Sequence, residues 1–274
     1  MTDILIIGAG NMGCAIGKGL LQSPNNHVYF KTLEGIETDM SDFKAEISRN
    51  QVFFNDHYDA FEKLNNPWII LAVKPHLVKP VIDETADLLQ KITPTALVSV
   101  AAGIDIKTIK SACSTDIPIV RAMPNTPVAT GNGLMGFYSE HEATNKAFEA
   151  LCQPLGLVPQ LENEDAFHLF TALAGSGPAY IFHLVEALSE AAYQHGMDKT
   201  QAGQVALQTF LGSATLLHHD NATSLRKKVT SPNGTTQAGL EQLMNDDLDP
   251  SKSHLTQLMF KTLDAAKKRS QNMN

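Results

Sequence analysis

The chain has 274 residues, of which 43% are hydrophobic and 18% charged, and its formal net charge is -8. This composition describes a folded globular protein with a sizeable core and excludes an intrinsically disordered chain. The acidic balance also argues against a general nucleic-acid binder, which usually carries a basic excess.

Cysteine usage and the N-terminus exclude further classes. The three cysteines, Cys14, Cys113 and Cys152, lie far apart and form no C-x-x-C pair, so the sequence indicates neither a disulfide framework nor a zinc site. No apolar run approaches the roughly 18 residues of a membrane span, and the N-terminus lacks a basic leader region. We therefore expect a cytoplasmic protein without a metal and without a nucleic-acid or membrane partner.

The first half of the chain alternates short apolar runs with amphipathic segments. The apolar runs predict buried strands at 3–8, 27–30, 68–73, 96–101 and 117–122. The amphipathic segments between them include 11–22 and 76–91. The polar span 32–50 makes the connection after the second strand longer than is usual in this kind of fold. This alternation predicts a mainly parallel sheet with helices on both faces, a doubly wound α/β fold.

The second half carries helical patterns only. Apolar residues recur at helical spacing in 165–173, 178–195, 199–219, 236–246 and 251–270. The helices expected at 178–195 and 199–219 have few charges on any face, which indicates burial in a bundle or against a second subunit. With a polar junction near 159–167, we predict an α/β domain at 1–162 and an all-helical domain at 163–274.

The motif GAGNMG, which begins at Gly8, follows the first strand directly and opens a helix. In such a turn Gly8 permits the tight bend, Gly10 lets the backbone approach a pyrophosphate, and Gly13 allows close helix–strand packing. The phosphates would meet the positive end of the helix at Asn11 and Met12. The motif therefore predicts dinucleotide binding.

The end of the second expected strand bears on the choice of dinucleotide. An acidic residue there would bind the ribose 2′-hydroxyl of NAD. This chain has Lys31 and Thr32 instead, with no acid before Glu34. A lysine beside a hydroxyl favours the 2′-phosphate, so we expect NADPH as the preferred cofactor, with NADH as the alternative.

Three further turns follow expected strands and are expected at the same sheet edge. AVKPH (72–76) places Lys74 beside a proline that fixes the turn, AAG (101–103) offers small residues, and RAMPNTP (121–127) places Asn125 between two prolines. Ligands of open α/β sheets bind at this carboxyl edge. Each turn alone is ordinary turn chemistry, but together they predict a cleft.

The late stretch VTSPNGTTQAGL (229–240) has two interpretations. It could be a helix–helix turn, because Asn-Gly and Ser-Pro mark turns anywhere, or a helix start whose N–H groups bind an anion. A reciprocal Ser/Thr capping box does not explain the hydroxyls, since Ala238 stands three residues after Thr235 and Gly239 three after Thr236. We therefore favour the anion site.

Taken together, six motifs resemble the pyrroline-5-carboxylate reductase family in type and order: GAGNMG, AVKP, AAG, MPNTP, GSGPAY (175–180) and VTSPNGTT. The resemblance spans nearly the whole chain, and GSGPAY with the late TSPNGTT is its most specific part. It implies an N-terminal Rossmann domain and a C-terminal helical dimerisation domain. It also implies reduction of 1-pyrroline-5-carboxylate to proline, the last step of proline biosynthesis, by a homodimer that family members often assemble into rings of dimers.

The resemblance also implies roles for individual residues. The residues expected to bind the dinucleotide are Gly8, Ala9, Gly10, Asn11, Met12, Gly13, Lys31, Thr32, His57, Ala72, Val73, Lys74, Pro75, Ala101, Ala102 and Asn125. The substrate carboxylate would be bound by the backbone amides of Gly234, Thr235 and Thr236, with the Thr236 hydroxyl facing the ring nitrogen. Ser231 lies beside this turn, and Glu164 matches an acidic substrate-side position.

Three of these matches depart from the family pattern or have a competitor. Lys228 stands where the family has asparagine before the signature valine, and His57 stands at a cofactor-side asparagine. Asn163 competes with Glu164 for the acidic position. These departures concern side-chain detail and leave the implied reaction unchanged.

The chemistry expected at the late turn needs no dedicated acid, because no His, Asp or Glu stands inside SPNGTT. We expect catalysis by positioning and electrostatics, with Thr236 as the catalytic residue that orients an iminium protonated by solvent. Since the cofactor motif and this turn belong to different domains, the site is expected to be shared between subunits.

Two rival functions remain open at this point. A β-hydroxyacid dehydrogenase or imine reductase also joins a Rossmann domain to helices, but the former requires a lysine that 178–195 lacks. A non-catalytic NADP-sensing protein would bind NADPH without oxidising it.

Overall fold

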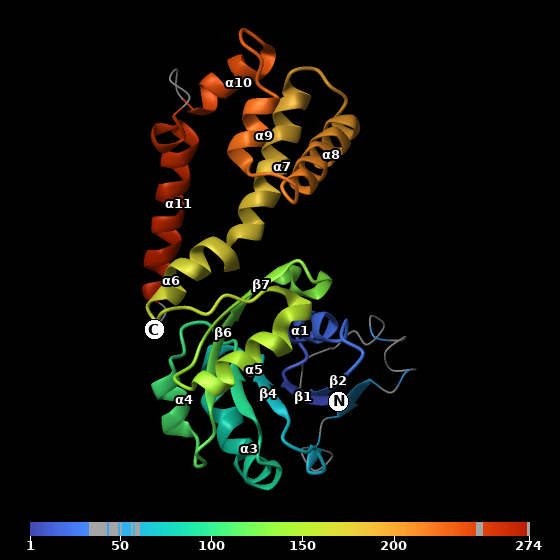
Figure 1. Ribbon diagram of the computed structural model, residues 1–274, viewed down its shortest axis with the longest axis vertical. Helices are drawn as coiled ribbons and strands as arrows, with labels where there is room; N and C mark the ends of the chain where they lie inside the picture. The colour runs from blue at the N-terminus through green and yellow to red at the C-terminus, as the bar shows by residue number, and fades with distance from the viewer. Residues whose placement is uncertain are drawn as a thin grey trace. The chain divides into compact units, whose positions relative to one another are not determined.

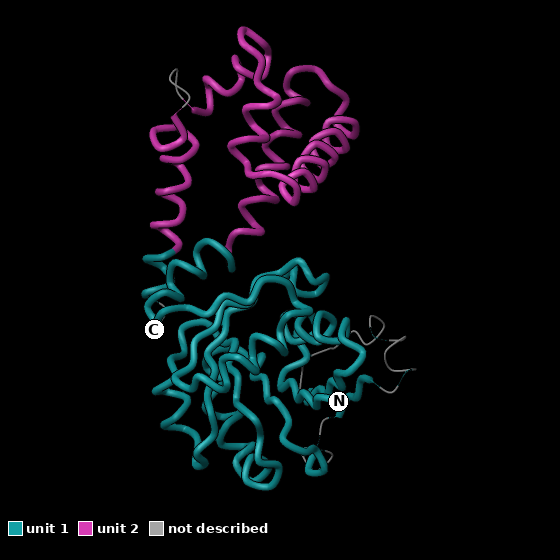
Figure 2. Tube along the Cα trace, in the orientation of Figure 1, with its two compact units in different colours: residues 1–175, 267–274 teal, residues 176–266 magenta. Residues whose placement is uncertain are grey.

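The computed structural model describes residues 1–32, 43, 49, 51–55, 57, 61–244 and 249–272 (Figure 1). The chain forms two compact units (Figure 2), the first made of Met1–Gly175 with Lys267–Asn274 and the second of Ser176–Ala266. The first unit therefore runs past residue 162, and the domain limits 1–162 and 163–274 stay a prediction.

The described residues of the first unit form one eight-stranded sheet with the order β3-β2-β1-β4-β5-β6-β7-β8. The strands are β1 (Thr2–Ile7), β2 (Asn26–Lys31), β3 (Val52–Asn55), β4 (Trp68–Leu71), β5 (Ala96–Ser99), β6 (Ile119–Pro124), β7 (Gly133–Tyr138) and β8 (Gly156–Leu157). All neighbouring pairs are parallel except β6 and β7. The mainly parallel sheet predicted from the sequence is confirmed.

The strand order reverses between β1 and β4, and this reversal positions the site. The chain leaves the β3 edge of the sheet and returns on the other side of β1. Ile7 at the end of β1 is in register with Lys31 of β2 and Leu71 of β4. Such a switch point leaves a crevice outside the carboxyl ends of the strands, where open α/β sheets bind ligands.

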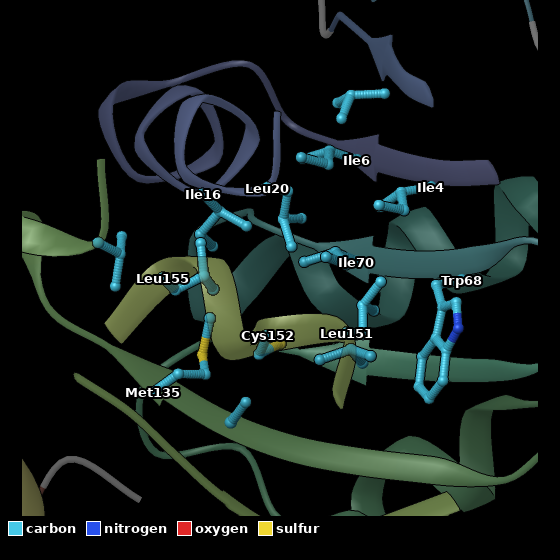
Figure 3. Close-up of a cluster of buried hydrophobic side chains, with 14 of the residues drawn as sticks. Ile4, Ile6, Ile16, Leu20, Trp68, Ile70, Met135, Leu151, Cys152 and Leu155 are labelled. Atoms are coloured by element: carbon cyan, nitrogen blue, oxygen red, sulfur yellow. The ribbon is translucent and has the colours of Figure 1, made fainter. Parts of the chain in front are cut away.

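Helices cover both faces of the sheet because successive strand residues point to opposite sides. They are α1 (Asn11–Leu20), α3 (Val78–Ile92), α4 (Ile106–Ala112) and α5 (Glu142–Cys152). On one face, α1 and α5 pack over Ile4 and Ile6 of β1, where Figure 3 shows Leu20 and Leu151 gathered with Ile70. On the other face, α3 and α4 pack over Leu5 and Ile7. Each face thus has its own core.

From Ala166 onward the described elements are all helices, as predicted. A short α6 (Ala166–Phe170) passes through the π-helical turn Thr171–Gly175 and is followed by α7 (Gly177–Gln194). The remaining helices are α8 (Lys199–Leu216), α9 (Ala222–Lys228), α10 (Thr235–Met244) and α11 (His254–Gln271). None of the described helices combines the length and the apolar character that a membrane crossing requires.

The second unit has almost no core of its own. Among its described residues only Ala202, Ala206, Met244 and Ser253 are buried, although α7 packs along α8. Large apolar side chains are instead exposed along its helices: Ile181, Phe182, Leu184, Leu188, Tyr193, Val205, Leu207, Leu211, Leu216, Leu217, Val229, Leu243, Leu255, Leu258, Met259 and Phe260. Apolar surface on this scale is unusual for a protein that acts alone.

Candidate active site

The GAGNMG turn has the geometry that its glycines predicted. Gly8 has a φ of +105°, and a Cβ there would lie 2.6 Å from the carbonyl oxygen of Ala72. A Cβ on Gly13 would overlap the carbonyl oxygen of Gly8. These two glycines are therefore required by the packing of the protein itself, because only glycine fits that backbone and that approach.

Gly10 is different, because a Cβ there would meet no atom within 4 Å and would point into open space. That space belongs to a cavity of about 430 Å³ lined by Gly10, Asn11, Met12, Ala72, Val73, Lys74, Leu77 and Val100. Lys74 caps the following 3₁₀ turn, which opens on Pro75. The cavity lies at the switch point of the sheet and brings together six of the sixteen residues predicted to bind the dinucleotide, namely Gly10, Asn11, Met12, Ala72, Val73 and Lys74.

The cavity suits an anionic ligand. The helix α1 begins at Asn11 with no side-chain cap and no acidic residue in its first turn. The first N–H groups of a helix have no acceptor within the helix, and their dipoles favour negative charge. Together with the missing Cβ of Gly10, this helix start fits the pyrophosphate of a dinucleotide.

The end of β2 lies beside this cavity at the same sheet edge, where Gly8 N–H donates to the Lys31 carbonyl at 3.0 Å. The Lys31 side chain is only 6% exposed, and its Nζ donates to the Thr32 carbonyl oxygen at 2.9 Å. Asn55, which the sequence did not single out, organises this end: its carbonyl accepts from Thr32 N at 3.0 Å and its Oδ1 from His57 N at 2.8 Å. Glu34 lies outside the described residues.

Two further predicted cofactor positions have internal partners. The Ala101 N–H donates to the Ser99 hydroxyl at 3.4 Å, and Ala101 is buried at the end of the AAG-bearing strand. The buried Asn125 amide donates to the Ala174 carbonyl at 3.1 Å and accepts from Leu134 N at 2.8 Å. Asn125 therefore connects separate segments of the first unit. The direct contacts of Ala101, Ala102 and Asn125 with a cofactor stay predictions.

Glu164 is part of a partly buried ion pair in the first unit. Its Oε1 accepts from Arg121 Nη1 at 3.0 Å and from Ile106 N at 3.0 Å. The Arg121 guanidinium also lies 4.5 Å from the centre of the Phe167 ring. Glu164 thus joins β6, the start of α4 and the segment before α6, and its predicted substrate contact stays a prediction.

The SPNGTT segment, in the second unit, forms a tight turn before α10. Asn233 has a left-handed φ of 58°, and the Gly234 N–H donates to the Ser231 carbonyl at 3.1 Å. The helix begins at Thr235, and its first backbone bond runs from Ala238 N to the Gly234 carbonyl at 3.2 Å. The N–H groups of Thr235 and Thr236 therefore have no acceptor within the helix, and both residues are exposed.

This geometry sharpens the predicted anion site. The Gly234 N–H already has an acceptor inside the turn, so Thr235 and Thr236 are the N–H groups that the turn offers. A residue that the sequence did not single out, Gln237, accepts from Asn233 N at 2.9 Å through its Oε1. A capping-box glutamine would accept from the cap residue Gly234, whereas Gln237 accepts from the residue before it, so no capping pattern in the sequence reveals this bond.

Lys228 ends α9, just before the turn, and its charge has a partner. Its Nζ donates to Asp220 Oδ2 at 2.7 Å, and the Ser224 hydroxyl donates to the same oxygen at 2.6 Å. The hydrogen bond from Lys228 and then the one from Ser224 hold the pKa of the Asp220 carboxyl below its ordinary value. The pair links the residues just before α9 to its last residue.

The described residues contain no cluster of His, Cys, Asp and Glu that would suit a metal ion.

Comparisons with known families cover both halves of the chain. Residues 164–273 match the family model described as pyrroline-5-carboxylate reductase dimerisation. Residues 3–103 match the model described as NADP oxidoreductase, coenzyme F420-dependent. The two matches correspond to the helical half and to the part of the sheet that carries the GAGNMG and AVKP turns.

Individual relatives match over almost the full length. Pyrroline-5-carboxylate reductase 2 of Bacillus subtilis strain 168 is 33% identical over 266 residues, covering 93% of this chain and 91% of the relative. The Pseudomonas aeruginosa pyrroline-5-carboxylate reductase is 30% identical over 272 residues, covering 97% and 95%.

Solved structures give the same likeness. A pyrroline-5-carboxylate reductase from Coxiella burnetii superposes with a TM-score of 0.82 at 31% identity, over 100% of this chain and 98% of that one. The Plasmodium falciparum pyrroline carboxylate reductase, solved with NADP bound, superposes with a TM-score of 0.77 at 21% identity, over 99% and 98%. The second likeness shows the fold alone.

Proposed function

The chain belongs to the pyrroline-5-carboxylate reductase family, and from this premise we propose that it reduces 1-pyrroline-5-carboxylate to proline, the last step of proline biosynthesis. The reaction is an NAD(P)H-dependent reduction of a C=N bond. The observation that carries the proposal is the near-complete match to reductases of this family, over the parts of the chain that hold both anion-binding helix starts.

The cofactor proposed is NADPH, with NADH as the weaker alternative. A bound nicotinamide dinucleotide would supply the hydride. The start of α1 at Asn11 and the open side of Gly10 would hold its pyrophosphate. Lys31 and Thr32 stand at the end of β2, where a cation and a hydroxyl favour a 2′-phosphate, and no acid precedes them on that strand.

The substrate would be held by the turn before α10. Its carboxylate would accept hydrogen bonds from the N–H groups of Thr235 and Thr236, with Ser231 and Gly234 closing the turn around it. The Thr236 hydroxyl would orient the ring nitrogen. Since SPNGTT contains no acid, the iminium proton would come from solvent, and the residues of the turn would lower the barrier by positioning.

The proposed assembly is a homodimer built through the second unit, with rings of dimers as a further level. The large apolar side chains exposed on α7, α8 and α11 support this proposal, because a second copy would remove them from water. The proposed site is complete only in the dimer, and the proposed location is the cytoplasm.

The direct test follows the loss of reduced-nicotinamide absorbance after pyrroline-5-carboxylate is added, with NADPH and NADH side by side. We expect oxidation of both, faster with NADPH at low concentration, and proline as the product. Tight NADPH binding without oxidation would replace the proposal with a cofactor-sensing function. Faster turnover with NADH would overturn the cofactor preference alone.

A threonine substitution tests the proposed catalytic residue. Thr236→Ala should lower kcat/KM by about 10²-fold or more, the range in which positioned hydrogen-bonding groups contribute. Thr223→Ala is the matched control, because Thr223 is another exposed threonine in the first turn of a helix of the second unit. Full activity in Thr236→Ala would remove Thr236 from the mechanism.

A further inference from the structure

We propose that Gln237 and Glu241 are positioning residues for the substrate turn, holding it in the shape that offers the N–H groups of Thr235 and Thr236 to a carboxylate. The inference rests on the proposed function and adds two residues to it. Neither side chain would touch the substrate. Both act through the backbone of the turn.

The two side chains form a relay of directed hydrogen bonds. Glu241 Oε1 accepts from Gln237 Nε2 at 2.8 Å, a partly buried contact within α10. That bond fixes which end of the Gln237 amide faces the turn, because a carboxylate accepts only from the NH₂ end. The other end, Oε1, accepts from Asn233 N at 2.9 Å.

The turn needs such a clamp because its backbone is unfavourable without support. Asn233 has a φ of 58°, a left-handed conformation that is disfavoured for a residue with a side chain. A Cβ on the next residue, Gly234, would overlap the Ser231 hydroxyl, so the chain is tightly closed there. With Asn233 N–H held by Gln237 and Gly234 N–H by Ser231, the next two N–H groups are the ones left for an anion.

The amide at position 237 suits an anion site better than a carboxylate would. Either glutamate or glutamine can cap a helix start from its third position. A glutamate there would place negative charge in the same turn as the substrate carboxylate and repel it. Gln237 accepts the Asn233 N–H as a neutral group, and the charge of Glu241 stands a full helical turn further along.

The experiment exchanges the two residues. In Gln237→Glu with Glu241→Gln, the net charge and the donor–acceptor pattern of the relay are kept, so the helix should fold as before. The carboxylate, however, moves to the helix start. We expect the KM for pyrroline-5-carboxylate to rise by about tenfold, with a smaller rise at high salt. The KM for NADPH and the melting temperature should stay near those of the wild type.

Truncation tests the clamp separately. Gln237→Ala should raise the KM for pyrroline-5-carboxylate by about tenfold, the effect of one lost hydrogen bond. Glu241→Ala should do so by less, and the double variant should add little to Gln237→Ala, because both residues belong to one relay. The control is Gln194→Ala, which removes a matched Gln–Glu pair on a different helix, since Gln194 Nε2 donates to Glu190 Oε1 at 2.9 Å on α7.

The outcomes separate this inference from the function on which it rests. A wild-type enzyme that does not oxidise NADPH with pyrroline-5-carboxylate would overturn the function itself. An active wild type whose exchanged and truncated variants keep the substrate KM would overturn only the positioning role. The positioning role would also be overturned if the KM for NADPH rose by the same factor as the KM for the substrate. A clear fall in the melting temperature of the variants would overturn it as well, because the effect would then be one of folding.

Discussion

The two compact units of this chain bury similar side chains to opposite extents. In the first unit Phe148, on α5, is 0% exposed because it packs on the sheet, whereas Phe182, on α7 of the second unit, is 63% exposed. A sheet presents two apolar faces, and helices from the same chain close both. The helices of the second unit have apolar surface on several sides and too few neighbours to cover it. The first unit therefore buries its apolar surface with elements of its own, whereas the described helices of the second unit leave theirs exposed.

The family match indicates which partner would cover these helices. Residues 164–273 match a dimerisation family, and this range contains every large exposed apolar side chain of the second unit. A second copy of the chain is the proposed cover. The comparison therefore predicts that substitutions in the first unit act on folding, and those on the exposed helices act on association.

The largest effect is expected from a charge placed on the exposed helices. Leu188→Glu on α7, at a side chain 47% exposed, should abolish the dimer and lower activity by about a hundredfold, because an unpaired charge buried in an interface costs about 3–5 kcal/mol. Leu157→Glu in β8 is the control, since Leu157 is 67% exposed in the first unit. Sedimentation velocity and the NADPH assay report the two outcomes. If the Leu188→Glu variant stayed dimeric, the exposed face of α7 would not be the dimer interface.

A pair of phenylalanine truncations gives the next largest effect. Phe148→Ala should lower the free energy of unfolding by about 3–5 kcal/mol, the usual cost of emptying a closed core. That loss should not depend on protein concentration. Phe182→Ala should cost less, and its cost should shrink on dilution, because the dimer that it weakens contributes less to stability at low protein concentration. Urea unfolding at two protein concentrations separates them, and a concentration-independent loss in Phe182→Ala would contradict the proposed interface.

How far the sequence predicts this fold depends on how local each signal is. The apolar runs that became β1, β2, β4, β5 and β6 are continuous, so their pattern alone indicates buried strands. The sequence did not predict β3, which has four residues, β7, whose two glycines weaken a strand pattern, or β8, which has two residues. It also missed α4, α5 and α9, which are short or follow turn residues closely. The span 32–50 lies almost wholly outside the described residues.

The same distinction between local and long-range signals applies to the residues of the candidate site. Gly8, Gly10 and Gly13 were predicted with their reasons, because the motif fixes a local backbone shape. The partners of Asn125 and Glu164 come from segments far along the chain, so no local pattern reveals them. The roles of both residues toward the ligands stay predictions.

Gln237 was missed for a different reason. A capping-box residue accepts from the N–H of the cap, which here is Gly234, whereas Gln237 accepts from Asn233, the residue before the cap. The motif predicts the helix start, but no capping pattern predicts a hydrogen bond to Asn233 N.

The smallest effect concerns one helix cap in the self-contained unit. Asp105 caps α4 by accepting from Thr108 N at 2.7 Å, so Asp105→Ala should lower the free energy of unfolding by about 1 kcal/mol. The hydrogen bonds from Thr108 hold the pKa of Asp105 below its ordinary value of 3.8. Because the folded pKa is the lower one, the charge-dependent stabilisation is complete above the unfolded pKa and is lost as the pH falls through the folded value.

The pH dependence distinguishes the charge of this cap from its shape. The stability gap between wild type and Asp105→Ala should narrow on acidification below pH 3.8, as measured by urea unfolding. Asp105→Asn keeps the capping oxygen without a titrating charge, so its gap to Asp105→Ala should stay constant over the same range. Because α4 packs in the closed core of the first unit, the gap should not change with protein concentration. A gap that shrinks on dilution would mean that the first unit also depends on a partner for its stability.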